Sequence, residues 1–95
     1  AYSATKGAIN QMTRSLALTY ARDNIRVNAI APGYVDTPIL AQVPQEMKDM
    51  MANQLPIGRL GKDQEIANLI TYLLSDNATF ITGAIVPIDG GYTAQ

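Results

Sequence analysis

The chain has 95 residues, of which 47% are hydrophobic and 16% charged, and its net charge is −1. This composition is typical of a globular protein and excludes a disordered or fibrous one. The small net charge creates no basic field, so we expect neither nucleic acid nor a membrane as a partner. Cysteine and histidine are absent, which excludes disulfides and thiolate metal sites and fits a reducing, cytoplasmic setting. We predict no metal site, and no run approaches the ~20 apolar residues that span a bilayer.

Residues 1–22 have the periodicity of a helix that begins without a capping residue and without Met, from which we expect a fragment of a longer protein. Tyr2 and Lys6 lie four residues apart and therefore stack on one helical face. That face coincides with an apolar stripe that we expect to point toward the core, made of Ile9, Met12, Leu16 and Tyr20.

The opposite face of this helix carries mostly small side chains, which let another helix approach closely. Plain solvent exposure is the alternative, and we favour a subunit contact. The face consists of Ala4, Gly7, Ala8, Gln11, Ser15 and Leu18.

Asp23-Asn24 is a turn pair that ends the helix, and residues 25–31 are predicted to form a short buried strand. A helix that leads into such a strand is typical of a parallel α/β sheet. Pro32 and Gly33 stop the strand, where Gly33 would permit close approach by a ligand. Ligands of open α/β sheets bind at the carboxyl ends of strands, so the loop that continues to Thr37 is a candidate site.

Residues 39–55 are weakly amphipathic, and Pro44 suggests a helix that starts near 44. Three Met between 47 and 51 fit either ordinary core or a mobile flap over an apolar substrate. After a turn-rich connector at 56–61, we predict a helix over 63–75, a strand over 84–88 and a turn at 89–91.

Four segments in register resemble the short-chain dehydrogenase/reductase family: Tyr2-x-x-x-Lys6, the run from Arg26 to Gly33, Pro56-Ile57-Gly58-Arg59, and Ile81-Thr82-Gly83 with Ile88-Asp89-Gly90-Gly91. The middle is similar to 3-oxoacyl-carrier-protein reductases, and the ending to tetrameric secondary-alcohol dehydrogenases. The resemblance implies an α/β fold, the C-terminal part of a Rossmann-like doubly wound parallel sheet. Residues 1–95 would be the C-terminal portion of a single domain, without its N-terminal cofactor-binding half.

The resemblance implies hydride transfer between NAD or NADP and a small-molecule carbonyl or secondary alcohol. Tyr2 would be the general acid/base, and Lys6 would lower its pKa and bind the nicotinamide ribose. A free phenol titrates near ~10, and a positive charge ~5 Å away stabilises the phenolate by roughly 3 kcal/mol, or ~2 pKa units. Pro32 and Gly33 would approach the nicotinamide, while the Val35 backbone and the Thr37 hydroxyl would hold its carboxamide.

The family's Gly-rich turn and catalytic Ser would both precede Ala1, so we expect no activity from this chain alone. The alternative is a non-catalytic fragment or scaffold that acts only in assembly. Sugar-nucleotide epimerases also use Tyr-x-x-x-Lys, but the Pro-Gly loop and the Asp-Gly-Gly tail argue against them. We further expect a homo-oligomer, tetramer or dimer, whose interfaces include the small-residue face and the tail from Ala84.

Overall fold

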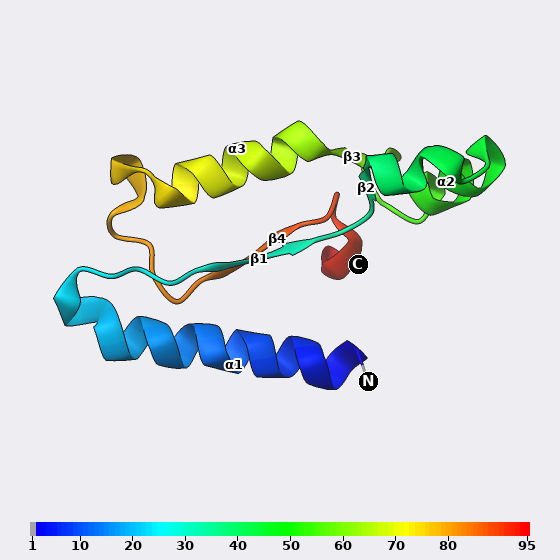
Figure 1. Ribbon diagram of the computed structural model, residues 1–95. Helices are drawn as coiled ribbons and strands as arrows, with labels where there is room; N and C mark the ends of the chain where they lie inside the picture. Colours follow the sequence, from blue (N-terminus) through cyan, green and yellow to red (C-terminus); the bar gives the residue numbers. More distant parts are fainter. Residues whose placement is uncertain (1) are drawn as a thin grey trace. The chain divides into compact units, whose positions relative to one another are not determined.

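The computed structural model describes residues 2–95, and of Tyr2 only the backbone. Its helices and strands, labelled in Figure 1, are α1 Tyr2–Tyr20, β1 Ala29–Pro32, β2 Val35–Asp36, α2 Gln45–Asn53, β3 Gly61–Lys62, α3 Asp63–Leu74 and β4 Ile85–Ile88. The chain divides into two compact units, Ala1–Ile30 with Thr71–Val86 and Ala31–Ile70 with Pro87–Gln95. Within the described residues, no helix combines the length and the apolar character needed to cross a bilayer.

Helix α1 ends where the sequence predicts. A short 3₁₀ turn, Ala21–Asp23, follows it, and Asn24 takes a left-handed conformation with φ of 63°. Asparagine tolerates this region because its short polar side chain costs little there. The Asn24 N–H donates to the Ala21 carbonyl, so the turn pair closes the helix as expected.

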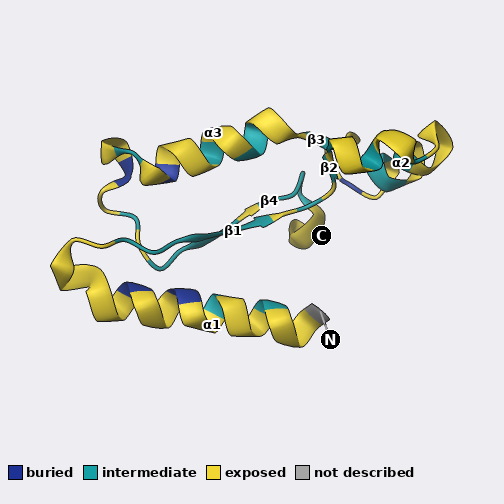
Figure 2. Ribbon diagram, in the orientation of Figure 1, coloured by how far each residue is buried: buried dark blue, intermediate teal, exposed yellow. Residues whose placement is uncertain are grey.

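Within this chain, the least exposed residues of α1 lie beside the predicted apolar stripe. Thr13 and Ala17 are its buried residues, with 7% and 2% of their surface exposed. Figure 2 shows these positions in dark blue along one side of the helix. The predicted stripe lies beside them and is 39–58% exposed, at Ile9, Met12, Leu16 and Tyr20.

Small size and a satisfied hydroxyl explain why Thr13 and Ala17 are the buried pair. The Ala17 Cβ would lie 3.4 Å from a Cβ built on Gly83, so the chain before β4 passes close to the helix. The Thr13 hydroxyl donates to the Ile9 carbonyl at 2.8 Å, which removes the cost of burying it. A larger side chain at position 17 would push this segment away.

Strand β1 is shorter than predicted, because residues 25–28 are linked to the chain before β4 largely by side chains. The Val27 N–H donates to the Thr82 hydroxyl at 3.1 Å. The Asn28 amide donates to the Ile81 carbonyl and accepts from the Ala84 N–H, both at 3.0 Å. These bonds take the place of a backbone ladder, so regular pairing starts only at Ala29.

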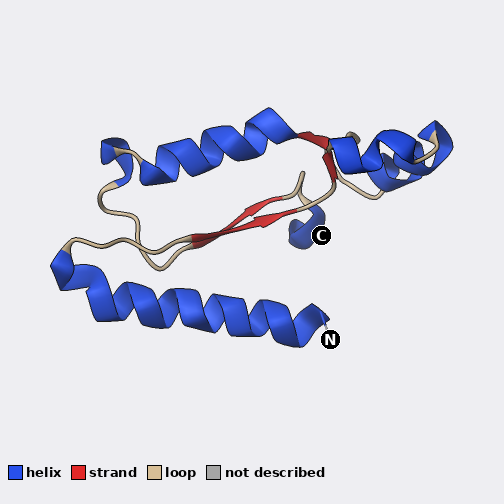
Figure 3. Cartoon of the chain, in the orientation of Figure 1, coloured by secondary structure: helices blue, strands red, loops and turns tan. Residues whose placement is uncertain are grey.

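Two short strand pairs complete the structure, drawn red in Figure 3. In the first, Ala29 N–H donates to Ala84 O and Gly33 N–H to Ile88 O, so β1 and β4 run parallel with a constant offset. The second joins β2 to β3 in parallel, with Val35 opposite Gly61. Strand β2 lies in a segment expected to be loop, and β3 begins at the end of the expected turn-rich connector. Neither was predicted, because two-residue strands carry no periodicity.

The later elements agree with their predicted positions. Helix α2 starts directly after Pro44, which is its N-cap, and α3 and β4 match their predicted spans to within one residue. Arg26 holds the far end of α3, because its guanidinium donates to the carbonyls of Leu73 at 2.6 Å and Ser75 at 3.2 Å. Arg26 therefore has a structural role at the end of this helix.

Candidate functional site

Lys6 lies on the inward side of α1. Its side chain is half-buried. Positions 6, 13 and 17 follow i, i+7 and i+11, so Lys6 shares a face with the buried Thr13 and Ala17. A lysine ammonium on such a face is partly removed from bulk water. In these less polar surroundings a charge interacts more strongly with its neighbours. The Tyr2 side chain lies outside the described residues, so its pairing with Lys6 stays a prediction.

The Pro-Gly segment follows the carboxyl end of β1. Pro32 is the last residue of that strand, and the Gly33 N–H donates to the Ile88 carbonyl at 3.1 Å. A Cβ at position 33 would stand 2.8 Å from the Asp89 Cβ and 2.9 Å from its Cα. Position 33 therefore requires glycine because the Asp89 segment of the same chain passes so close to it. The ligand contact predicted for Gly33 would have to involve its other side.

Val35 and Thr37 have backbone and hydroxyl groups that could bind a ligand. The Gly61 N–H donates to the Tyr34 carbonyl at 2.9 Å, and Val35 is the residue opposite Gly61. In a parallel pair of this register, the N–H and C=O of Val35 point away from β3. Thr37 precedes the 3₁₀ segment Pro38–Gln42, and its side chain makes no capping hydrogen bond to it. These groups fit an amide ligand such as a carboxamide.

The loop candidates and the helix candidate belong to different units. Pro32, Gly33, Val35 and Thr37 follow one another within Ala31–Ile70, whereas Lys6 belongs to the unit that contains α1. The four loop residues lie on one segment because they are neighbours in sequence. The described residues contain no group of three or more His, Cys, Asp or Glu side chains placed to hold a metal ion.

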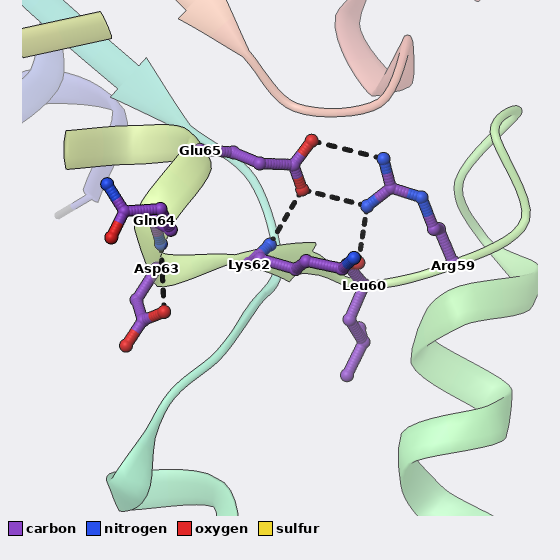
Figure 4. Close-up of polar contacts among 6 residues, drawn as sticks. All are labelled: Arg59, Leu60, Lys62, Asp63, Gln64 and Glu65. Atoms are coloured by element: carbon purple, nitrogen blue, oxygen red, sulfur yellow. Dashed lines mark hydrogen bonds and ion pairs between the residues drawn. The ribbon is translucent and has the colours of Figure 1, made fainter. Parts of the chain in front are cut away.

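An ion pair that sequence analysis did not identify supports β3, which pairs with the candidate loop. Figure 4 shows the Arg59 guanidinium donating to both Glu65 carboxylate oxygens, at 2.8 and 3.1 Å. Glu65 also accepts from the Lys62 N–H at 2.9 Å. These bonds, that of Arg59 foremost, lower the pKa of Glu65 to about 2. The six-residue spacing of this pair gave no signal, because it spans a turn and a strand rather than one helix.

A cavity of about 280 Å³ lies in the same unit as the loop. None of the described candidates, Lys6, Pro32, Gly33, Val35 or Thr37, is among the residues that line it. The cavity therefore does not support the candidate site directly. Its lining includes Tyr34, Asp89 and the Arg59–Glu65 pair, together with a set of apolar residues, Leu55, Ile57, Ile66, Pro87 and Ile88.

Comparisons with known proteins agree with one another. The family model described as Enoyl-(Acyl carrier protein) reductase matches residues 1–93. A cis-4-hydroxycyclohexanecarboxylate dehydrogenase of Sinomonas cyclohexanicum is 53% identical over 98% of this chain and 37% of its own length. A tropinone reductase homolog of Datura stramonium is 47% identical over 99% of this chain and 37% of its own length. The chain thus spans a little over a third of these relatives.

A solved structure supports the fold. A short chain dehydrogenase family protein from Francisella tularensis superimposes with a TM-score of 0.89 at 45% identity, over 99% of this chain and 43% of the other. The expected fold class is confirmed, since the chain has the α/β architecture of part of a Rossmann-like parallel sheet.

Proposed function

Because this chain belongs to the short-chain dehydrogenase/reductase family, we propose that the protein carrying it is an oxidoreductase. It transfers hydride between NAD or NADP and a small-molecule carbonyl or secondary alcohol. The observation that carries the proposal is the half-buried Lys6 one helical turn after Tyr2. Residues 1–95 would form the C-terminal portion of a single domain whose cofactor-binding half precedes them.

In this proposal, the Tyr2–Lys6 pair donates or accepts the proton that accompanies hydride transfer. A nicotinamide cofactor, when bound, supplies the hydride carrier. Reduction of a carbonyl leaves an alkoxide oxygen, to which the Tyr2 phenol donates its proton, and oxidation of an alcohol reverses this transfer. The Lys6 ammonium lowers the pKa of the phenol toward neutrality, because a nearby positive charge stabilises the phenolate. It would also bind the nicotinamide ribose.

The loop after β1 orients the cofactor in this proposal. Pro32 and Gly33 would lie at the nicotinamide, and the outward N–H and C=O of Val35 would bind the carboxamide. Thr37 would add its hydroxyl, which is not used for capping. A carboxamide has both donors and an acceptor, so a peptide unit and a hydroxyl together can satisfy it and fix which ring face is offered.

Substitution of Tyr2 in the full-length protein tests the proposal. Tyr2→Phe should lower the rate of nicotinamide-dependent carbonyl reduction by at least about 100-fold, the contribution of a general acid, and leave cofactor affinity within a few-fold. Tyr20→Phe is the matched control, because Tyr20 is a tyrosine 40% exposed at the other end of α1. Equal loss of activity in both variants, or full activity of Tyr2→Phe, would contradict the proposed role.

A scaffold that acts only in assembly is the competing function. The small-residue face of α1 is the feature that favours it, because small side chains let another helix approach closely. Calorimetric titration of the full-length protein with NAD and NADP separates the two functions. Binding of either nucleotide supports the oxidoreductase function. If neither nucleotide binds, the scaffold function is supported instead.

Association into a dimer or tetramer is also proposed, through the small-residue face of α1 and the tail. Ala8 lies on that face and is exposed. Ala8→Glu should lower the sedimentation coefficient of the full-length protein, because a charge in a close helix contact loses its hydration. Ala67→Glu, at an exposed position of α3, is the control. A wild-type monomer at micromolar concentration would contradict association.

A further inference from the structure

The C-terminal residues 89–95 fold back as a hook whose shape depends on Asp89. The Asp89 carboxylate accepts from the Gly91 N–H at 3.0 Å and from the Thr93 N–H at 3.2 Å. It also accepts from the Thr93 hydroxyl at 2.7 Å. Gly90 and Gly91 have φ of 64° and 92°, a turn that other residues adopt only with strain. The Asp89 carboxylate therefore holds the first part of the tail, as far as Thr93.

This hook contacts the candidate loop at its first residues. Asp89 fills the space where a Gly33 side chain would be, as the 2.8 Å distance to the built Cβ indicates. The Tyr92 ring packs against the Tyr34 ring, with centroids 6.3 Å apart and planes inclined by 55°. Gly33 and Tyr34 immediately precede Val35, whose peptide groups the proposed function uses.

The far end of the hook is fixed to the end of α2. The Gln95 side chain donates to the Gln54 carbonyl at 3.2 Å, and the Tyr34 hydroxyl donates to the Gln54 side-chain carbonyl at 3.3 Å. The Ile57 N–H donates to the Gly90 carbonyl at 3.1 Å. Tyr34 therefore contacts both the hook, through Tyr92, and Gln54, which the hook also binds.

We infer that the hook, residues 89–95, positions the Gly33–Thr37 loop for the nicotinamide end of the cofactor, with Asp89 and Thr93 as positioning residues. This inference rests on the proposed function. The hook touches no reacting atom in this role, but acts by fixing the peptide units that hold the carboxamide. Loosening it should weaken binding of the nicotinamide end and leave the adenosine end unchanged, because the proposed function assigns the loop to the former alone.

The experiment compares two ligands in the full-length protein. Calorimetry gives dissociation constants for the preferred dinucleotide, NAD or NADP, and for its ADP-ribose counterpart, which lacks the nicotinamide. Thr93→Val removes one hydroxyl donor without changing side-chain size. It should weaken dinucleotide binding about fivefold, the usual effect of one hydrogen bond, and change ADP-ribose binding less than twofold. Thr93→Ser should restore the wild-type ratio of the two constants.

Controls keep the outcomes distinct. Thr79→Val changes an exposed threonine outside the hook and should alter neither constant. Gln95→Met removes the contact with Gln54 and serves as a milder second variant, expected to weaken the dinucleotide alone. An unchanged ratio in both hook variants, or equal weakening of both ligands, overturns this inference only. Wild-type protein that binds neither ligand overturns the proposed function and this inference together.

Discussion

Gly33 and Asp89 are in direct backbone contact, since a Cβ at position 33 would stand 2.9 Å from the Asp89 Cα. The contact joins the end of β1 to the end of β4, where the candidate loop and the hook begin. A side chain at 33 has no room unless these chain segments separate. The identity of this residue is therefore set by packing between strands.

Substitution of Gly33 should destabilise the protein. Gly33→Ala forces a methyl group into the Asp89 backbone, and overpacking of this kind costs about 1–3 kcal/mol. We expect a lower midpoint of urea unfolding in the full-length protein. Ala67→Glu is the control, because Ala67 lies at an exposed position of α3, outside the proposed subunit contact. An equal or higher midpoint for Gly33→Ala would contradict the close contact.

Removal of the Arg26 guanidinium should loosen the end of α3. Arg26→Met keeps the apolar stem but loses the bonds to the carbonyls of Leu73 and Ser75, at roughly 2 kcal/mol of unfolding free energy. Arg26→Lys should rescue only part of this loss, because an ammonium cannot reproduce the planar fork. Thermal unfolding measures both effects, and Arg22→Met, at an exposed position, should leave the midpoint within about 2 °C.

Substitution of Asn28 by Asp should destabilise the protein. Asn28→Asp keeps the acceptor for the Ala84 N–H but loses the donor to the Ile81 carbonyl and sets two acceptors against each other. An unpaired acceptor costs about 1–3 kcal/mol, which urea unfolding can detect. Asn68→Asp is the control, since Asn68 only accepts, from the Gln64 side chain at 2.7 Å. Similar midpoints for the two variants would show that the Asn28 donor is dispensable.

The Arg59–Glu65 pair should make stability depend on pH in the acid range. Folding lowers the pKa of Glu65 from 4.5 to about 2, chiefly through the Arg59 hydrogen bond. Its stabilising effect is therefore complete above pH 4.5 and is lost as the pH falls through about 2. NMR titration of the Glu65 carboxyl should show this low pKa. Arg59→Gln should raise it toward the ordinary value.

The size of this effect is limited by solvent. The Arg59 and Glu65 side chains are 47% and 42% exposed, so water and salt screen the pair. The pKa difference between wild type and Arg59→Gln should therefore shrink in 1 M salt. Arg14→Gln, at an exposed position of α1, should leave the Glu65 titration unchanged.

The order of helices and strands could be predicted from local signals. The 3.6-residue period gave α1 and α3, Pro44 gave the start of α2, and the apolar run before Asp89 gave β4. Asp23-Asn24 was recognisable as a turn pair, and Asn24, Gly90 and Gly91 have the left-handed backbone that Asn and Gly favour. The candidate residues Lys6, Pro32, Gly33, Val35 and Thr37 were likewise named from motifs, and their roles stay predictions.

Contacts between distant segments were decided only by the tertiary structure. The segment near Gly83 packs against the small Ala17, whereas the predicted apolar stripe beside it is exposed in this chain. Residues 25–28 carry a strand composition, yet Asn28 replaces the ladder with its side chain. Gly33 also packs against Asp89, a contact that its motif did not reveal, and the ligand contact expected for it stays a prediction. Local sequence determines backbone preference, whereas which surfaces meet depends on shape and on hydrogen-bond partners more than fifty residues away.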